Sequence, residues 1–101
     1  MEIKISNQGD NMLMYMSGRF DFNDHRVLKS TYDPILLMDG IKRIEIDMSA
    51  IEYLDSSALG MLMLLRERAL AVSKTVVLSR PNPTVMQILD IANFKKLFTI
   101  L

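Results

Sequence analysis

The segment between Asp47 and Gly60 holds the side chains with the clearest chemical potential, because two adjacent serines, Ser56 and Ser57, follow the carboxylate of Asp55. An apolar run with helical spacing starts directly after them, so the serines stand at the start of a helix. In that position one hydroxyl can cap the free backbone amides of the first turn, and the other can sit in that turn at little cost. Capping is therefore one sufficient explanation for the pair.

The same position also suits a regulatory phosphate on a serine. Free amides and the positive end of the helix dipole favour an anion at a helix start. A phosphoserine carries about −1.5 to −2 charges at neutral pH. Asp55 adds to the negative field beside it, so a partner that docks against the neutral form would be repelled by the phosphorylated form. Both interpretations of the serines remain open on local chemistry alone.

Catalytic and metal chemistry have little support in this chain. His25 is the only histidine and there is no cysteine, which excludes thiolate sites and the usual two- and three-histidine zinc sites. A Ser-His-Asp triad lacks its Gly-x-Ser-x-Gly elbow, and no Gly-x-x-x-x-Gly-Lys-Ser/Thr phosphate loop is present. Asp47 and Asp55 could form a carboxylate pair, but acidic residues at strand ends are usually just solvated. We expect no enzymatic activity, no metal and no cofactor.

The composition describes one small domain over residues 1–101. Half of the residues are apolar, and 12 basic side chains balance 12 acidic ones. Zero net charge argues against general nucleic-acid binding, which needs basic side chains against the phosphate backbone. No apolar run reaches the roughly 18 residues that membrane insertion requires. The polar start, MEIKISNQGD, lacks the apolar core of a secretory signal, so we expect a cytoplasmic protein.

The elements that position these residues follow from hydrophobic periodicity. The expected strands cover residues 2–6, 12–16, 41–48, 75–78 and 98–101. The expected helices run from a cap at Asn23 or Asp24 through Tyr32, over 56–72 and over 85–91. Gly18 should end the second strand, whose apolar residues suit cover on both faces, and Pro34 should break or kink the first helix. This order predicts an α/β fold, a mixed four- to five-stranded sheet with three to four helices packed against it.

The orientation of the helix over residues 56–72 decides which side chains meet a partner. A helical wheel places Leu59, Leu62, Met63, Ala69 and Leu70 on the core face, together with an unexplained Arg66. The opposite face then holds Ser57, Met61, Leu64 and Arg68. Large apolar residues beside a serine resemble a docking surface, with Met61 facing a partner. Alternatively, Met61 and Leu64 are isolated exposed residues or are covered by another element.

Three short motifs, in order along nearly the whole chain, resemble those of the STAS family, which is shared by sulfate transporters and bacterial anti-sigma factor antagonists. They are Gly18-Arg19-Phe20-Asp21, Asp47-Met48-Ser49 and Asp55-Ser56-Ser57-Ala58-Leu59-Gly60. Ala58 replaces a glycine often found in that slot. The resemblance implies the STAS fold for this chain.

The resemblance also implies a function as an anti-sigma factor antagonist. A partner kinase, commonly the anti-sigma factor itself, would phosphorylate Ser56, and a PP2C-type serine phosphatase would reverse the modification. The unphosphorylated domain would bind the anti-sigma factor and free the sigma factor. The expected partner-binding residues are Asp21, Asp55, Ser57, Gly60, Met61, Leu64 and Arg68. The alternative is a small STAS subunit that docks on a transporter ATPase without being phosphorylated.

Overall fold

The chain begins with a β-hairpin. In the computed structural model, which describes residues 1–101, β1 (Glu2–Gln8) and β2 (Asn11–Phe20) pair antiparallel, with Ile3 opposite Met16. Gly9 makes the turn with a φ of +72°, in the left-handed region that glycine adopts without steric cost. The predicted hairpin is therefore confirmed.

Three parallel strands complete a five-stranded sheet in the order β1-β2-β3-β4-β5. They are β3 (Arg43–Leu54), β4 (Thr75–Ser79) and β5 (Thr99–Ile100). The helices are α1 (His25–Leu36), α2 (Ser56–Ala71) and α3 (Pro83–Ile91), with short 3-10 turns η1 (Phe22–Asp24) and η2 (Phe94–Lys96). The mixed α/β fold expected from the alternation of elements is confirmed.

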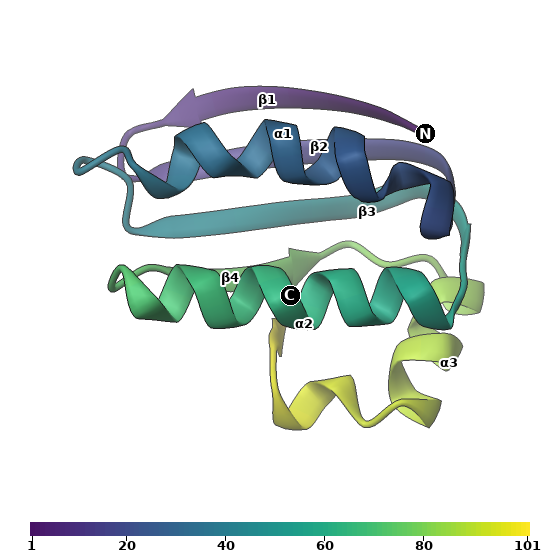
Figure 1. Ribbon diagram of the computed structural model, residues 1–101. Helices are drawn as coiled ribbons and strands as arrows, with labels where there is room; N and C mark the ends of the chain where they lie inside the picture. Colours follow the sequence, from purple (N-terminus) through teal and green to yellow (C-terminus); the bar gives the residue numbers. More distant parts are fainter.

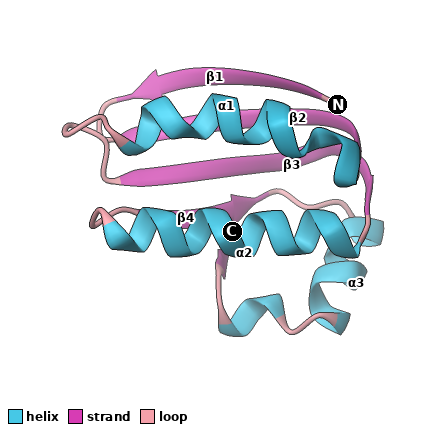
Figure 2. Cartoon of the chain, in the orientation of Figure 1, coloured by secondary structure: helices cyan, strands magenta, loops and turns pink.

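The helices gather on one side of the sheet. Each parallel step adds the next strand in the same direction, and right-handed crossovers then place the connecting helices on the same face. Figures 1 and 2 show α1 and α2 lying side by side over this face. Their first residues lie at the end of the sheet where β2 and β3 finish. Side chains at that end can therefore form one site.

This one-sided arrangement corrects the expectation that the strand at 12–16 is covered on both faces. Met12, Met14 and Met16 are buried, whereas Tyr15 on the opposite face is 37% exposed. The side chains of a strand alternate between its two faces, and only one face of the sheet receives α1 and α2. The apolar run therefore does not indicate burial of both faces here.

Both central strands are longer than predicted. Gly18 does not end β2, because it adopts a φ of +95° at an irregularity in the pairing with β3, and the strand continues to Phe20. β3 likewise continues past Met48 to Leu54. A bulge supported by glycine keeps the two strands paired while one bends. The extension carries both strands to the start of the helices that follow them.

Of the break or kink predicted at Pro34, the break is wrong, because α1 continues through that residue to Leu36. Proline in a helix removes one backbone hydrogen-bond donor, but Pro34 lies in the last turn of α1, so few helical hydrogen bonds follow it.

A buried lysine holds the connection after α1. Lys74, which is 5% exposed, donates from Nζ to the carbonyl oxygens of Met38 and Ile41 at 2.6 and 2.8 Å. This buried lysine ties the connection after α1 to the start of β4.

The core is a single cluster of 24 buried hydrophobic residues between the sheet and its helices. Five of the nine methionines are buried, and their flexible side chains help to fill the core. They are Met12, Met14, Met16, Met48 and Met61. No helix of the fold is both long and apolar enough to cross a bilayer.

Candidate functional site

The ends of β2 and β3 bring the first and third sequence motifs together. Phe20 pairs with Leu54 in the last position of the parallel register, and the amide of Asp55 donates to the carbonyl of Phe20 at 3.3 Å. Asp21 and Asp55 therefore begin neighbouring helical segments, η1 and α2, which contact each other. Two motifs separated by more than thirty residues in the chain thus share one edge of the sheet.

Asp21 serves as the N-cap of η1. Its carboxylate accepts a hydrogen bond from the amide of Asn23 at 2.9 Å, and its own amide donates to the carboxylate of Asp24 at 2.9 Å. This reciprocal capping box satisfies donors that the short helix leaves free. Asp24, whose side chain is buried within the box, is also the N-cap residue of α1. The cap position expected at Asn23 or Asp24 is therefore confirmed at Asp24, although its side chain makes no hydrogen bond to the first turn of α1.

Asp55, rather than either serine, is the N-cap of α2. Its carboxylate accepts from the amide of Ala58 at 2.8 Å, and its carbonyl accepts from the amide of Leu59 at 3.2 Å. The prediction that Ser56 or Ser57 caps this helix is wrong, because an ionised carboxylate one residue earlier already fills that position. Capping therefore does not account for either serine hydroxyl.

Ser56 and Ser57 form the exposed first turn of α2. Asp55 accepts hydrogen bonds from the amides of Ala58 and Leu59, and the amides of Ser56 and Ser57 have no protein acceptor. These two donors and the positive end of the helix dipole favour negative charge at this position. The site therefore has an accessible hydroxyl group next to unpaired amides that can bind an anion.

The middle motif, Asp47-Met48-Ser49, is not part of this site. Asp47 is fully buried and lies eight residues before Asp55, about 25 Å away along an extended strand, so the two carboxylates are not a catalytic pair. The carboxylate of Asp47 accepts from the amide and hydroxyl of Ser49 at 2.9 and 2.7 Å and from the guanidinium of Arg80. The motif fastens the end of β4 to the middle of β3.

These contacts also determine the charge state of Asp47. Burial on its own raises the pKa of a carboxyl group, because it disfavours the charged form. The hydrogen bonds from Ser49 and Arg80, together with the positive charge of Arg80, outweigh burial and hold the pKa of Asp47 below its ordinary value. Asp47 is therefore a buried, ionised structural anchor.

The observed orientation of α2 corrects the predicted docking face. Met61 is 8% exposed and belongs to the core, whereas Met63 and Leu70, predicted to be core, are 43% and 49% exposed. The buried residues of the helix are Ala58, Met61, Leu62, Leu65 and Ala69. Successive residues turn by about 100°, so the true core face is rotated by roughly a quarter turn from the predicted one. The sequence holds no signal that singles out Met63, because α2 has apolar residues all round and the spacing alone does not choose the core face.

Polar contacts on both flanks of α2 are consistent with this orientation, which buries Ala58, Leu62 and Leu65 in the core. On one side Arg68 donates to the hydroxyl of Tyr32 in α1 at 3.3 Å. On the other side Arg66 donates from Nε to the carbonyl of Leu97 at 2.7 Å, which accounts for its place on the predicted core face. Leu64 is half-buried, so the stripe through Leu64 and Arg68 lies beside α1 and is not a free surface.

The exposed face of α2 combines small and apolar residues. Ser56, Ser57 and Gly60 are exposed, and Met63 follows one turn later. A Cβ atom added at Gly60 would meet nothing within 4 Å, so the surface above this residue is open. Phe22, directly after Asp21, is 66% exposed at the same end of the molecule. We call Ser56, Ser57, Gly60 and Met63 the α2 face.

Comparison with known proteins places the chain in a family. The family model described as "Mlab, STAS domain" matches residues 3–101. A STAS-domain containing protein of Pseudomonas aeruginosa is 38% identical over 95 residues, which cover 94% of this chain and 92% of that protein.

Solved structures share the fold at low sequence identity. The unphosphorylated anti-sigma factor antagonist SpoIIAA superposes with a TM-score of 0.82 at 14% identity, over 99% of this chain and 88% of that one. A putative anti-sigma factor antagonist of Thermotoga maritima gives 0.85 at 18% identity, over 97% and 84%. SpoIIAA in its phosphorylated form gives 0.74 at 13% identity, over 99% and 91%. With a family model that matches nearly every residue and a fold shared with these proteins, the chain belongs to the STAS family.

Proposed function

We propose that this protein is an anti-sigma factor antagonist whose binding to a partner is switched by phosphorylation of Ser56. In this proposal it acts in the cytoplasm as a non-enzymatic binding module. The unphosphorylated form binds an anti-sigma factor that is also a serine kinase, and phosphorylation releases it. A PP2C-type serine phosphatase restores the binding form. The proposal combines the geometry at the start of α2 with the fold shared with anti-sigma factor antagonists.

One observation carries this proposal: Asp55 caps α2, so the hydroxyl of Ser56 is exposed and has no structural task. A serine used as a cap would lose its hydrogen bond to the helix when modified, and the helix start would weaken. Here the cap survives modification of Ser56. The fold can therefore tolerate a phosphate at this position while the surface around it changes.

The electrostatics at the helix start give the switch its two states. A phosphate on Ser56 adds about −1.5 to −2 charges to a surface that already carries Asp55 and Asp21. The free amides of the first turn partly compensate this charge within the protein, so the domain stays folded. A partner that buries the α2 face would instead have to desolvate the phosphate or approach it with acidic groups. Binding of such a partner is therefore weakened by phosphorylation.

Phosphorylation is tested on the native protein with two matched variants. Phosphate-affinity electrophoresis of the protein from its own cells should show a shifted band that Ser56→Ala abolishes and Ser57→Ala retains. Ser57 is the matched control because it is the neighbouring exposed serine on the same turn. A shifted band that persists in Ser56→Ala, or that only Ser57→Ala removes, overturns the assignment of Ser56.

The function itself is tested with the purified anti-sigma factor kinase. Unmodified protein and Ser56→Ala should bind it, and protein phosphorylated on Ser56 should bind at least about tenfold more weakly, because buried charge must then be desolvated. Equal binding of both forms contradicts the switch. Constant binding to a transporter ATPase, with no phosphate on Ser56 in cells, would support the alternative function of a constitutive ATPase subunit.

A further inference from the structure

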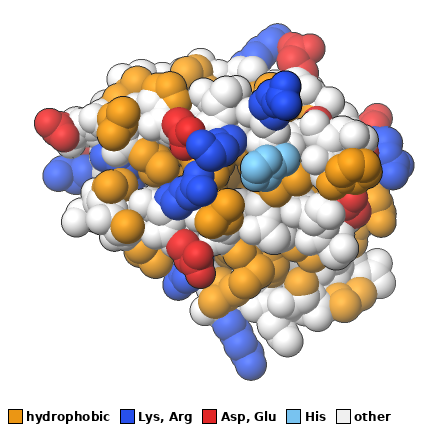
Figure 3. Space-filling model, in the orientation of Figure 1, with side chains coloured by type: hydrophobic (Ala, Val, Ile, Leu, Met, Phe, Trp, Pro, Cys, Tyr) orange, Lys and Arg blue, Asp and Glu red, His pale blue; other side chains and the backbone are white.

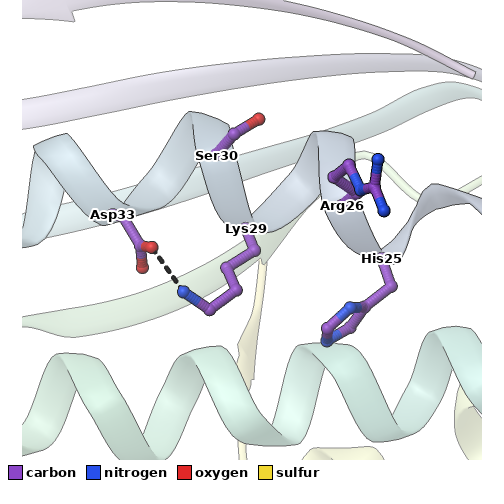
Figure 4. A pocket seen from close by; sticks show the side chains of 5 residues that line it. All are labelled: His25, Arg26, Lys29, Ser30 and Asp33. Carbon is purple, nitrogen blue, oxygen red and sulfur yellow. Dashed lines mark hydrogen bonds and ion pairs between the residues drawn. The ribbon is translucent and has the colours of Figure 1, made fainter.

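The outward surface of α1 carries a polar hollow that the proposed switch does not use. It has a volume of about 350 Å³ and no hydrophobic lining. Its lining residues are His25, Arg26, Lys29, Ser30 and Asp33, all from α1. Figure 4 shows His25, Lys29 and Asp33 directed toward the side of α2, and Figure 3 shows Lys and Arg side chains gathered around the histidine. The hollow is therefore formed by α1 alone, and three of its five lining side chains point toward α2.

Positive charge is in excess around this hollow. Asp33 is its only carboxylate, and two cations share it: Lys29 at 2.6 Å and Arg68 of α2 at 3.9 Å. Arg26 forms no ion pair with any residue of the protein, and it is exposed. Because the whole chain has zero net charge, this cationic surface is a local feature rather than a consequence of composition.

The cations can exchange their partner at little cost. Lys29 and Asp33 are 41% and 42% exposed, and ion pairs between exposed side chains contribute only about 0–1 kcal/mol to stability. Lys29 can therefore turn from Asp33 to an incoming carboxylate, and Arg68 still neutralises Asp33. Arg26 offers a guanidinium fork that matches a carboxylate in two hydrogen bonds. The charge around the hollow therefore favours the binding of carboxylate groups.

We propose that His25, Arg26 and Lys29 form a docking surface for an acidic segment of a partner protein. The lining contains no apolar residue, unlike the mostly apolar cavities that hold small organic ligands. The three cationic or hydrogen-bonding side chains lie within one turn of a rigid helix, so they present a row rather than a single point charge. Such a row fits several carboxylates on one segment.

This surface adds a second contact to the α2 face without depending on Ser56. α1 and α2 begin at the same end of the sheet, and the outer surfaces of both helices lie on the same side of the molecule (Figure 1). A partner that covers the α2 face can therefore reach the row with an adjacent acidic segment. Charge attraction mainly raises the rate and selectivity of association, whereas the α2 face contributes through burial of its small residues and of Met63. The two contacts are separable by mutation.

The proposal is tested by titrating the isotope-labelled full chain with a synthetic glutamate-rich peptide and following its amide signals by NMR. The changes should concentrate at residues 25–33 and weaken as salt rises from about 20 mM to about 300 mM, because exposed charges are screened. Arg26→Glu combined with Lys29→Glu should weaken binding by about tenfold or more. Arg26→Gln, at a residue without an ion pair, should weaken it in the same direction while leaving the fold intact.

A matched control is available at η2. Lys95 forms an ion pair with Asp90 at 3.3 Å, just as Lys29 does with Asp33 on α1. Lys96, like Arg26, forms no ion pair. Lys95→Glu combined with Lys96→Glu changes the net charge equally and should leave peptide binding unchanged. Equal losses in both double variants, or signal changes spread over the whole surface, overturn the proposal.

Two further results also overturn it. If inorganic phosphate produces the same signal changes at a similar concentration, the hollow is a site for small anions instead. If the signals of residues 25–33 change with protein concentration alone, a second copy of this chain occupies the surface. Neither result bears on phosphorylation of Ser56, so failure of this inference is distinguishable from failure of the proposed switch.

Discussion

The carboxylate of Asp55 accepts a hydrogen bond from the amide of Ala58 at 2.8 Å, across the first turn of α2. This contact holds the start of the helix and leaves Ser56, which lies between the two residues, exposed. A carboxylate cap is also favoured by the helix dipole, whose positive end it meets. The structural and the regulatory tasks of this turn are thereby divided between adjacent residues.

Replacing the cap should weaken the fold more than replacing the serine. We expect Asp55→Ala to lower the free energy of unfolding by about 1 kcal/mol, since the Ala58 amide loses its acceptor. Ser56→Ala should change it by less than about 0.5 kcal/mol, as is usual for exposed positions. Urea unfolding measures both. A larger loss for Ser56→Ala than for Asp55→Ala would show that the serine supports the helix start.

Met61 and Met63 should affect stability and binding in the reverse of the way that the helical wheel predicts, because Met61 is buried and Met63 is exposed. Met61→Ala should lower the free energy of unfolding by about 2–4 kcal/mol, because it opens a cavity in the core. Met63→Ala should cost less than about 1 kcal/mol but weaken partner binding, since its side chain is 43% exposed on the α2 face. Urea unfolding and a binding titration with the anti-sigma factor distinguish them. The reverse order in either measurement contradicts the observed orientation of α2.

A substitution at Gly60 should increase stability while it weakens partner binding. Gly60→Ala should raise the free energy of unfolding by about 0.5–1 kcal/mol, since glycine is a poor helix former and the added methyl group meets nothing within 4 Å. The same methyl group stands on the α2 face, where it should weaken a closely packed partner. Thermal unfolding and the binding titration measure the two effects. A less stable Gly60→Ala protein would mean that the surface above this residue is not open.

The buried carboxylate of Asp47 should make stability depend on pH in the acidic range. Its pKa in the folded protein is below the ordinary value of 3.8, so its contribution is fully present above that pH and is lost as the pH falls through the folded-state pKa. Asp47→Asn should therefore be less stable than the native protein at pH 7. The difference should shrink at the acidic end of the titration, where the native carboxylate is protonated too.

Urea unfolding across this pH range measures the difference between Asp47→Asn and the native protein. Asp39→Asn is the control, because Asp39 is an exposed residue in the connection after α1. It should follow the native curve closely. A constant difference between Asp47→Asn and the native protein at every pH would show that the two proteins differ only in packing.

Local signals in the sequence were sufficient for the order of elements and the position of Ser56. Apolar patterns predict the presence and order of the strands but end β2 and β3 several residues too early, and the run after Asp55 predicts α2 to within a residue of its observed end. The cap residues are harder to predict from the sequence, because Asp, Ser and Asn all suit a cap position and only geometry chooses among adjacent candidates. Asp55 caps α2 and Asp21 caps η1 because each carboxylate directly precedes its helical turn and lies within hydrogen-bond distance of a free amide in that turn.

The sequence by itself determined the alternation of strands and helices, the family motifs and a serine at a helix start, because these depend on neighbours a few residues apart. Only the tertiary structure decided which face of α2 is exposed, since that helix has apolar residues all round and the packing against the sheet and α1 selects the buried ones. Arg68 then contacts Tyr32 on one flank and Arg66 contacts Leu97 on the other. The tertiary structure also decided that Asp47 binds Arg80 and that the cations of α1 lie beside Arg68. These relations join residues more than thirty positions apart, and no local periodicity carries information about them.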